Sequence, residues 1–115
     1  MKNWTDICYL DDIPKMGAVC ALHEGKQVAI FNLSHQNGQF KNCVKSMCNV
    51  DPFADASVLS RGIISDIEGR QVVASPLNKL HFCLDTGQCL QHPDTSVSVF
   101  PVRVRDNKVQ LQVCS

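Results

Sequence analysis

Short runs of apolar residues alternate with turn residues along the whole chain, and this rhythm restricts the possible folds more than any other feature. Apolar stretches such as Val28-Ala29-Ile30-Phe31 are brief, and no stretch sustains helical periodicity. Strands at such close intervals are typical of an all-β sandwich or barrel. The expected strands are residues 4–10, 17–22, 27–33, 40–44, 63–67, 71–74, 80–84, 97–104 and 108–113.

Turn residues separate these runs at defined places. His23-Glu24-Gly25-Lys26 predicts a hairpin with glycine at a position of positive φ, and Asp106-Asn107 predicts another. Asn37-Gly38 is a further strong turn signal. Residues 45–61 and 75–79 lack the strand rhythm, and we expect them to be irregular, with one helical turn in the first. Irregular loops of that length in a small domain are typically functional.

Length and charge narrow the functional classes. The chain has 115 residues, so we expect a single domain over residues 1–115. Its 11 basic and 11 acidic residues balance, and no basic stripe is present, which argues against a nucleic-acid partner. The N-terminus has no secretory pattern, and no apolar stretch is long enough to span a membrane. We therefore expect a cytoplasmic protein without a membrane partner.

Seven cysteines occur without a Cys-x2-Cys pair. An odd count without a signal peptide argues against a disulfide framework. Cys8, Cys20 and Cys83 lie in strand-like runs, where we expect buried thiols. The spacings of the remaining set are a poor match to a zinc site. That set consists of Cys43, Cys48, Cys83 and Cys89.

Histidines suggest no catalytic site. His23, His35 and His92 lie in apparent turns, where solvated imidazoles are expected, and His81 is expected to be structural or at the surface. No combination of Ser, His and an acid stands out for nucleophilic catalysis, and no glycine-rich phosphate loop is present. We expect no catalytic residue in this chain.

The two irregular segments contain Cys48-Asn49-Val50-Asp51-Pro52 and Ser75-Pro76-Leu77-Asn78. They resemble the two ligand loops of a Rieske domain, which supply Cys-x-His and Cys-x2-His to a [2Fe–2S] cluster. The stretch from His81 to Leu90 is similar to the segment behind the second loop of that family. The resemblance implies a Rieske-like all-β fold with two projecting loops. The positions that match the four ligands are Cys48, Val50, Ser75 and Asn78.

Only Cys48 keeps a ligand's chemistry. Val50 has no donor atom, while Ser75 and Asn78 offer oxygen atoms that are poor ligands for this cluster. We therefore expect no cofactor and no metal in this chain. Without a metal, packing and hydrogen bonds must hold the loops, and we expect Ser75 and Asn78 to bond backbone groups. Packing is expected from Val50, Pro52, Phe53 and Leu77.

Further stretches are similar to the small subunit of assimilatory NAD(P)H-dependent nitrite reductase, and this resemblance extends over nearly the whole chain, from residue 4 to residue 113. They include Asp11-Asp12-Ile13-Pro14, Asp51-Pro52-Phe53-Ala54, Val58-Leu59-Ser60-Arg61-Gly62-Ile63 and Phe100-Pro101-Val102-Arg103-Val104. The resemblance implies a non-redox subunit in nitrate and nitrite assimilation. Its partner would be a large subunit that carries FAD, an iron–sulfur centre and siroheme and reduces nitrite to ammonium.

Loop residues are the candidates for contact with that large subunit. They are Asp51, Phe53, Arg61, Leu77, Asn78 and Lys79. One alternative is a Rieske-type [2Fe–2S] ferredoxin that carries electrons to an oxygenase, which the ligand count disfavours. A free-standing scaffold domain of the same shape is also open, because a fold does not fix a function.

Overall fold

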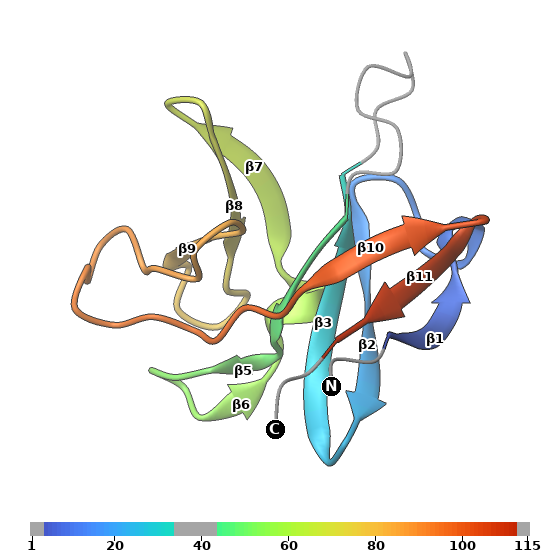
Figure 1. Ribbon diagram of the computed structural model, residues 1–115. Coiled ribbons are helices and arrows are strands. Elements are labelled where there is room, and N and C mark those ends of the chain that lie inside the picture. The colour runs from blue at the N-terminus through green and yellow to red at the C-terminus, as the bar shows by residue number, and fades with distance from the viewer. Residues whose placement is uncertain (1–3, 34–43, 113–115) are drawn as a thin grey trace.

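The structure, a computed structural model, describes residues 4–33 and 44–112. Within these ranges its elements are strands and two short 3-10 helices, which confirms the all-β expectation (Figure 1). The helices are η1 (Leu10–Asp12) and η2 (Leu59–Arg61). The strands are β1 (Thr5–Tyr9), β2 (Gly17–His23), β3 (Lys26–Asn32), β4 (Val44–Cys48), β5 (Val50–Asp51), β6 (Ala56–Ser57), β7 (Ile63–Ile67), β8 (Arg70–Ala74), β9 (His81–Cys83), β10 (Val102–Arg105) and β11 (Lys108–Leu111).

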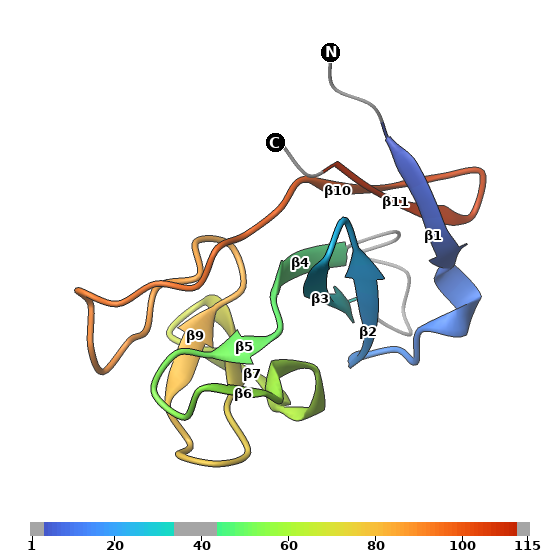
Figure 2. The ribbon, with the colours of Figure 1, turned by 90° about the horizontal axis from the view of Figure 1, so that it is seen from below.

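These strands form four antiparallel sheets, ordered β1-β11-β10, β2-β3-β4, β5-β6 and β7-β8-β9. The sheet β2-β3-β4 lies in the middle. The sheet β1-β11-β10 covers one of its faces, and β7-β8-β9 with β5-β6 lies on the other side (Figures 1 and 2). The two segments that resemble ligand loops belong to this second group, which is therefore the place to look for a site.

β3 explains why one apolar run can serve two cores. Val28 and Ile30 point into a cluster with Val109 and Leu111 of β11. Ala29 and Phe31 point to the opposite face, into a cluster that includes Val73, Phe82 and Leu84. Side chains alternate across a strand, so only a strand covered on both faces reads as a continuous apolar run. These four residues of β3 have 0% exposure, as burial on both faces requires.

Two sequence expectations about strands were wrong. Residues 45–61 are not irregular throughout, because β4 spans Val44–Cys48 and pairs with β3. The alternation of apolar and polar residues is weak in β4, because Lys45 is half-buried and the polar residue Ser46 is buried. Residues 97–101 are not part of the final strand, since β10 begins at Val102. The expected turn at Asn37-Gly38 lies outside the described residues.

The long connection from Leu84 to Pro101 is fixed by a few backbone contacts. Isolated bridges join Gln88 to Ser96 and Met47 to Val99. Gly87 has a φ of +80°, and its carbonyl accepts a 2.8 Å hydrogen bond from the Val97 amide. A Cβ at Gly87 would lie 1.9 Å from the Val97 carbonyl oxygen. Only glycine fits this approach, which anchors the connection beside the second loop.

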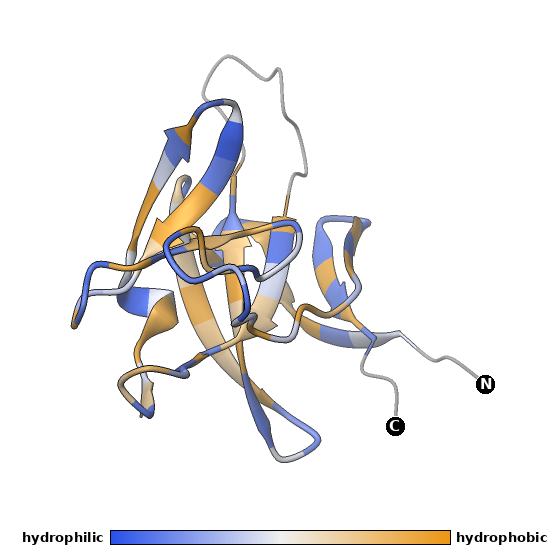
Figure 3. Cartoon of the chain, turned by 90° about the vertical axis from the view of Figure 1, so that its left-hand side faces the viewer, coloured by the Kyte–Doolittle hydropathy of each residue, from blue (hydrophilic) through white to orange (hydrophobic). Residues whose placement is uncertain are grey.

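Hydrophobic residues gather on the strands where the sheets face one another, and the tips of the β2-β3 and β7-β8 hairpins are hydrophilic (Figure 3). None of the helices in residues 4–33 and 44–112 is long and apolar enough to cross a membrane.

Candidate functional site

Asp51 connects the two irregular loops. It ends β5, and its side chain is completely buried. One carboxylate oxygen, Oδ2, accepts a 2.5 Å hydrogen bond from Ser75 Oγ and a 2.9 Å hydrogen bond from Asn78 Nδ2. We call Asp51, Ser75 and Asn78 the loop clasp. Two of the four positions that match Rieske ligands thus meet at one oxygen atom contributed by the other loop.

The second carboxylate oxygen is also occupied. Asp51 Oδ1 accepts hydrogen bonds from the backbone amides of Phe53 at 2.9 Å and Ala54 at 3.3 Å. A carboxylate offers about four acceptor positions, so these four donors satisfy it. Hydrogen bonds to an ionised acceptor are stronger than neutral ones, and this compensates for removing the group from water.

The second loop is closed by its own hydrogen bonds. Ser75 Oγ accepts a hydrogen bond from the Leu77 amide at 3.3 Å, and Asn78 Oδ1 accepts one from the Leu80 amide at 3.0 Å. The expectation that Ser75 and Asn78 bond backbone groups is confirmed. The side-chain bonds to Asp51 were not expected, and the only available signal for them was an aspartate beside a proline in a loop.

Packing at the loop tip follows the expectation in part. The Phe53 ring lies 6.3 Å from the Phe82 ring and 5.0 Å from the His92 ring, measured between centroids. Leu77, in contrast, is 58% exposed, so its side chain contributes little packing. Phe53 itself remains 43% exposed, and the loop tip therefore presents two large apolar side chains to the surroundings.

Asn49 is a buried residue that the sequence analysis missed. Its Oδ1 accepts a 2.7 Å hydrogen bond from the Ser60 amide, and its Nδ2 lies 3.4 Å from Cys20 Sγ. It therefore ties the start of the first loop to η2 and β2. Its position immediately after β4 could have indicated this role, since asparagine side chains at such places often form hydrogen bonds with nearby backbone groups.

The other ligand-matching positions stay apart from the clasp. Cys48 ends β4 and Val50 begins β5, and both are half-buried. Among the described residues there is no cluster of three or more His, Cys, Asp or Glu arranged to hold a metal ion. Cys43, one member of the weak zinc alternative, lies outside the described residues.

The expected contact residues divide into two groups. Phe53, Arg61, Leu77, Asn78 and Lys79 are exposed. Asp51 is not exposed: its side chain has no accessible surface in this chain. The physical reason is the clasp, which places this carboxylate beneath the second loop.

Two further expectations about burial were wrong. His23 has only 9% exposure, because it ends β2 rather than extending into the turn. Cys20 is exposed although it shares a face with buried Ala29, and β2 is an edge strand of its sheet. Cys83 is buried as expected, and Cys8 is half-buried. His92 is exposed, in line with its turn position.

The thiols differ in acidity. Burial raises the pKa of Cys8, and nearby Asp12 raises it further. Burial of the sulfur also raises the pKa of Cys20, although Arg61 opposes the shift. At Cys83 burial again raises the pKa, but hydrogen bonds from Thr86 and from the Asp85 amide outweigh it, so the pKa is lowered overall.

Alkylation should reveal this difference. In the native protein iodoacetamide should modify Cys20 but leave buried Cys83 and Cys89 unmodified, because the reagent needs access as well as a thiolate. Since the pKa of Cys20 is raised, its rate of alkylation should still increase with pH at values where the rate for a free thiol no longer changes. Peptide mass spectrometry across a pH series measures this, with urea-unfolded protein as control. A Cys20 profile that coincides with the unfolded control would contradict the prediction.

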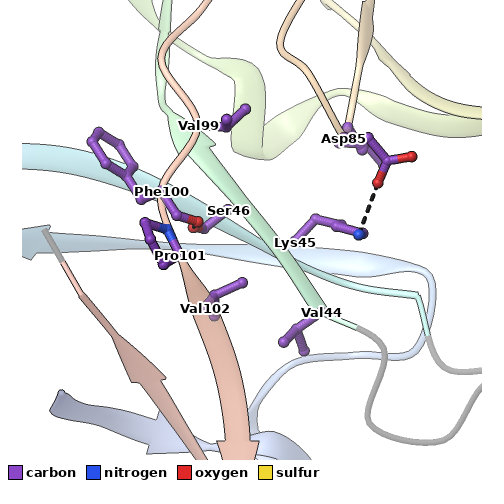
Figure 4. A pocket seen from close by; sticks show the side chains of 9 residues that line it. Val44, Lys45, Ser46, Asp85, Val99, Phe100, Pro101 and Val102 are labelled. Carbon is purple, nitrogen blue, oxygen red and sulfur yellow. Dashed lines mark hydrogen bonds and ion pairs between the residues drawn. The ribbon is translucent and has the colours of Figure 1, made fainter.

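In one pocket away from the loops, two polar side chains of the lining are bonded to other residues of the protein. It has a volume of about 380 Å³ and lies between β4 and residues 99–102 (Figure 4). Lys45 Nζ forms a 2.8 Å ion pair with Asp85, and Ser46 Oγ donates a 2.8 Å hydrogen bond to the Phe100 carbonyl. The first contact links β4 to the turn that follows β9 and the second links β4 to the segment before β10, so these polar groups act structurally.

Comparison with known proteins agrees with this geometry. The sequence pattern of the Rieske-like [2Fe-2S] domain matches residues 3–112. The nitrite reductase (NADH) small subunit of Salmonella typhimurium is 45% identical over 112 residues, which are 97% of this chain and 99% of that protein. The chain belongs to the nitrite reductase (NADH) small-subunit family. This membership confirms the Rieske-like fold and the resemblance drawn from the sequence.

Solved and fused relatives extend the comparison. The NMR structure of NirD from Escherichia coli superimposes on this family member with a TM-score of 0.89 at 43% identity and covers 100% of both chains. The nitrite reductase [NAD(P)H] large subunit of Klebsiella oxytoca is 34% identical over 108 residues. That match covers 94% of this chain but only 11% of the large subunit, so a domain of this kind forms part of a larger polypeptide there.

Proposed function

We propose that this chain is the small, non-redox subunit of an NAD(P)H-dependent nitrite reductase, acting in the cytoplasm in nitrate and nitrite assimilation. The observation that supports this most is the full-length similarity to nitrite reductase (NADH) small subunits. In this proposal residues 1–115 form one Rieske-like domain without catalytic residues. The large subunit carries FAD, an iron–sulfur centre and siroheme, and it reduces nitrite to ammonium.

The donor chemistry of the loops supports the absence of a [2Fe–2S] cluster in this proposal. A Rieske cluster needs two cysteine and two histidine ligands. The four matching positions offer one thiol, no imidazole, and two side chains that already donate hydrogen bonds to Asp51. The residues present therefore do not fit the cluster, and no electron-transfer step through this chain is derived.

The large subunit is the proposed partner, and two features support it. The Klebsiella oxytoca relative carries a similar domain within its large-subunit chain, so the two parts are covalently joined there. In this chain the loop tip exposes Phe53 and Leu77 beside Asn78 and Lys79. Exposed large apolar side chains with a polar border are typical of contact surfaces between proteins.

Reconstitution with a large subunit tests the proposal. The purified chain should be colourless, contain no stoichiometric iron, and form a complex with the large subunit that restores NAD(P)H-linked nitrite reduction. Iron analysis, a visible spectrum and a steady-state assay with and without the chain measure these outcomes. A brown protein with two irons per chain would instead favour the ferredoxin alternative. Full activity of the large subunit alone would contradict a supporting role.

A further inference from the structure

A groove runs along the outer face of the sheet β7-β8-β9, beside the second loop. Its volume is about 470 Å³. Strand register places Ile63, Ala74 and His81 opposite one another as a row across the three strands. The neighbouring row of Ile64, Val73 and Phe82 packs into the core, so the Ile63 row faces outward. We call this feature the lateral groove.

The charged side chains of the lateral groove are all cationic. Arg61 shortly precedes β7 and Lys79 shortly precedes β9, the two outer strands of the sheet, and both side chains are exposed. No aspartate or glutamate lines it. Within residues 4–33 and 44–112 neither cation forms an ion pair. Asp51 bonds Ser75 of the groove lining, but Asp51 is buried and its side-chain oxygens already accept four hydrogen bonds.

His81 adds a third hydrogen-bond donor. The Gln91 side chain accepts a 3.0 Å hydrogen bond from the His81 amide through Oε1, which fixes Nε2 as the donor end of Gln91. Gln91 Nε2 lies 2.8 Å from His81 Nδ1, so Nδ1 is the acceptor of this contact. In a neutral imidazole the proton then resides on Nε2, which is a donor.

These features distinguish the lateral groove from the rest of the molecule. In the pocket of Figure 4 the cation, Lys45, is already paired with Asp85. The lateral groove presents a guanidinium, an ammonium and an imidazole N–H, next to Ile63, which is 75% exposed. Two cations with no carboxylate in the lining, next to an exposed isoleucine, complement carboxylate groups beside an apolar residue.

We propose that the lateral groove binds an acidic segment of the large subunit, with carboxylates on Arg61 and Lys79 and an apolar residue on Ile63. This inference rests on the proposed function and adds the chemistry of the partner surface. The large subunit is the occupant because a similar domain is part of that polypeptide in the Klebsiella oxytoca relative. Charge complementarity then selects the acidic part of its surface.

Charge reversal tests the proposal with the intact large subunit. The double variant Arg61→Glu/Lys79→Glu should weaken binding to the large-subunit holoenzyme by about tenfold or more, measured by calorimetry. The loss should be greatest at low salt, because exposed charges are screened as ionic strength rises. The matched control is Lys15→Glu/Arg70→Glu, which reverses two exposed charges outside the lateral groove and should bind like the unmodified chain.

The outcomes separate this inference from the proposed function. If the unmodified chain and the double variant bind equally well, the lateral groove is not the contact and the proposed function stands. If both double variants weaken binding equally, the effect is net charge, and the lateral-groove proposal fails. No binding by the unmodified chain overturns both proposals. If the reversed variant unfolds by circular dichroism, Arg61→Gln/Lys79→Gln replaces it and must still weaken binding.

Discussion

Replacing Asp51 with alanine should lower the free energy of unfolding by about 3 kcal/mol. The substitution removes the carboxylate oxygen that accepts hydrogen bonds from Ser75 Oγ, which is buried, and from the Asn78 side-chain amide. It also strips two backbone amides of their acceptor. Water can replace the acceptor for exposed Asn78 but less readily for Ser75. Urea denaturation followed by circular dichroism measures the loss.

Two companion variants make the result interpretable. Asp51→Asn keeps the shape and one acceptor oxygen, so it should cost less, about 1–2 kcal/mol. Asp94→Ala removes an exposed carboxylate from another turn and should change stability by less than about 0.5 kcal/mol. Equal stability of Asp51→Ala and Asp94→Ala would show that the loop clasp does not hold the loops together.

Gly87→Ala should destabilise the fold by roughly 3 kcal/mol or more, because two costs add. The φ of +80° is unfavourable for alanine, and the new Cβ would lie 1.9 Å from the Val97 carbonyl oxygen. The Val97 amide bonds Gly87, and the Gly87 amide donates a 2.7 Å hydrogen bond to Cys83, so the backbone cannot easily withdraw. Thermal unfolding measures the effect.

Gly69→Ala is the matched control for that substitution. Gly69 has a φ of +82°, but a Cβ there would meet nothing within 4 Å. Only the conformational cost of about 1 kcal/mol applies, so the difference between the two variants isolates the close approach to Val97. If the two alanine variants unfold at the same temperature, residues 84–101 adapt freely and the anchoring role of Gly87 is wrong.

The strands could largely be predicted from the sequence, because alternation and turn residues are local signals. The run Val28-Ala29-Ile30-Phe31 even indicated a strand, although not that both of its faces are covered. β4 was missed because its alternation is weak and its register is set by β3. The lateral groove was beyond prediction as well, since Ile63 and His81 become neighbours of Ala74 only through strand pairing.

The site was predictable at the level of loops but not of contacts. The replaced ligand positions drew attention to Ser75 and Asn78, and both take part in the loop clasp. Asp51 was named only as a candidate contact residue of the first loop, and its burial was not foreseen. Its partners lie 24 and 27 residues away, and no periodicity encodes a hydrogen bond at that separation.

The loop clasp is made only of oxygen and nitrogen atoms in covalent side chains. Such atoms neither gain nor lose electrons at the potentials found in cells. The two loops should therefore keep one geometry in air, under a strong reductant and in the presence of a chelator. If the chain carries no cluster, as proposed above, it reaches its final shape directly after synthesis, without machinery that delivers iron and sulfide.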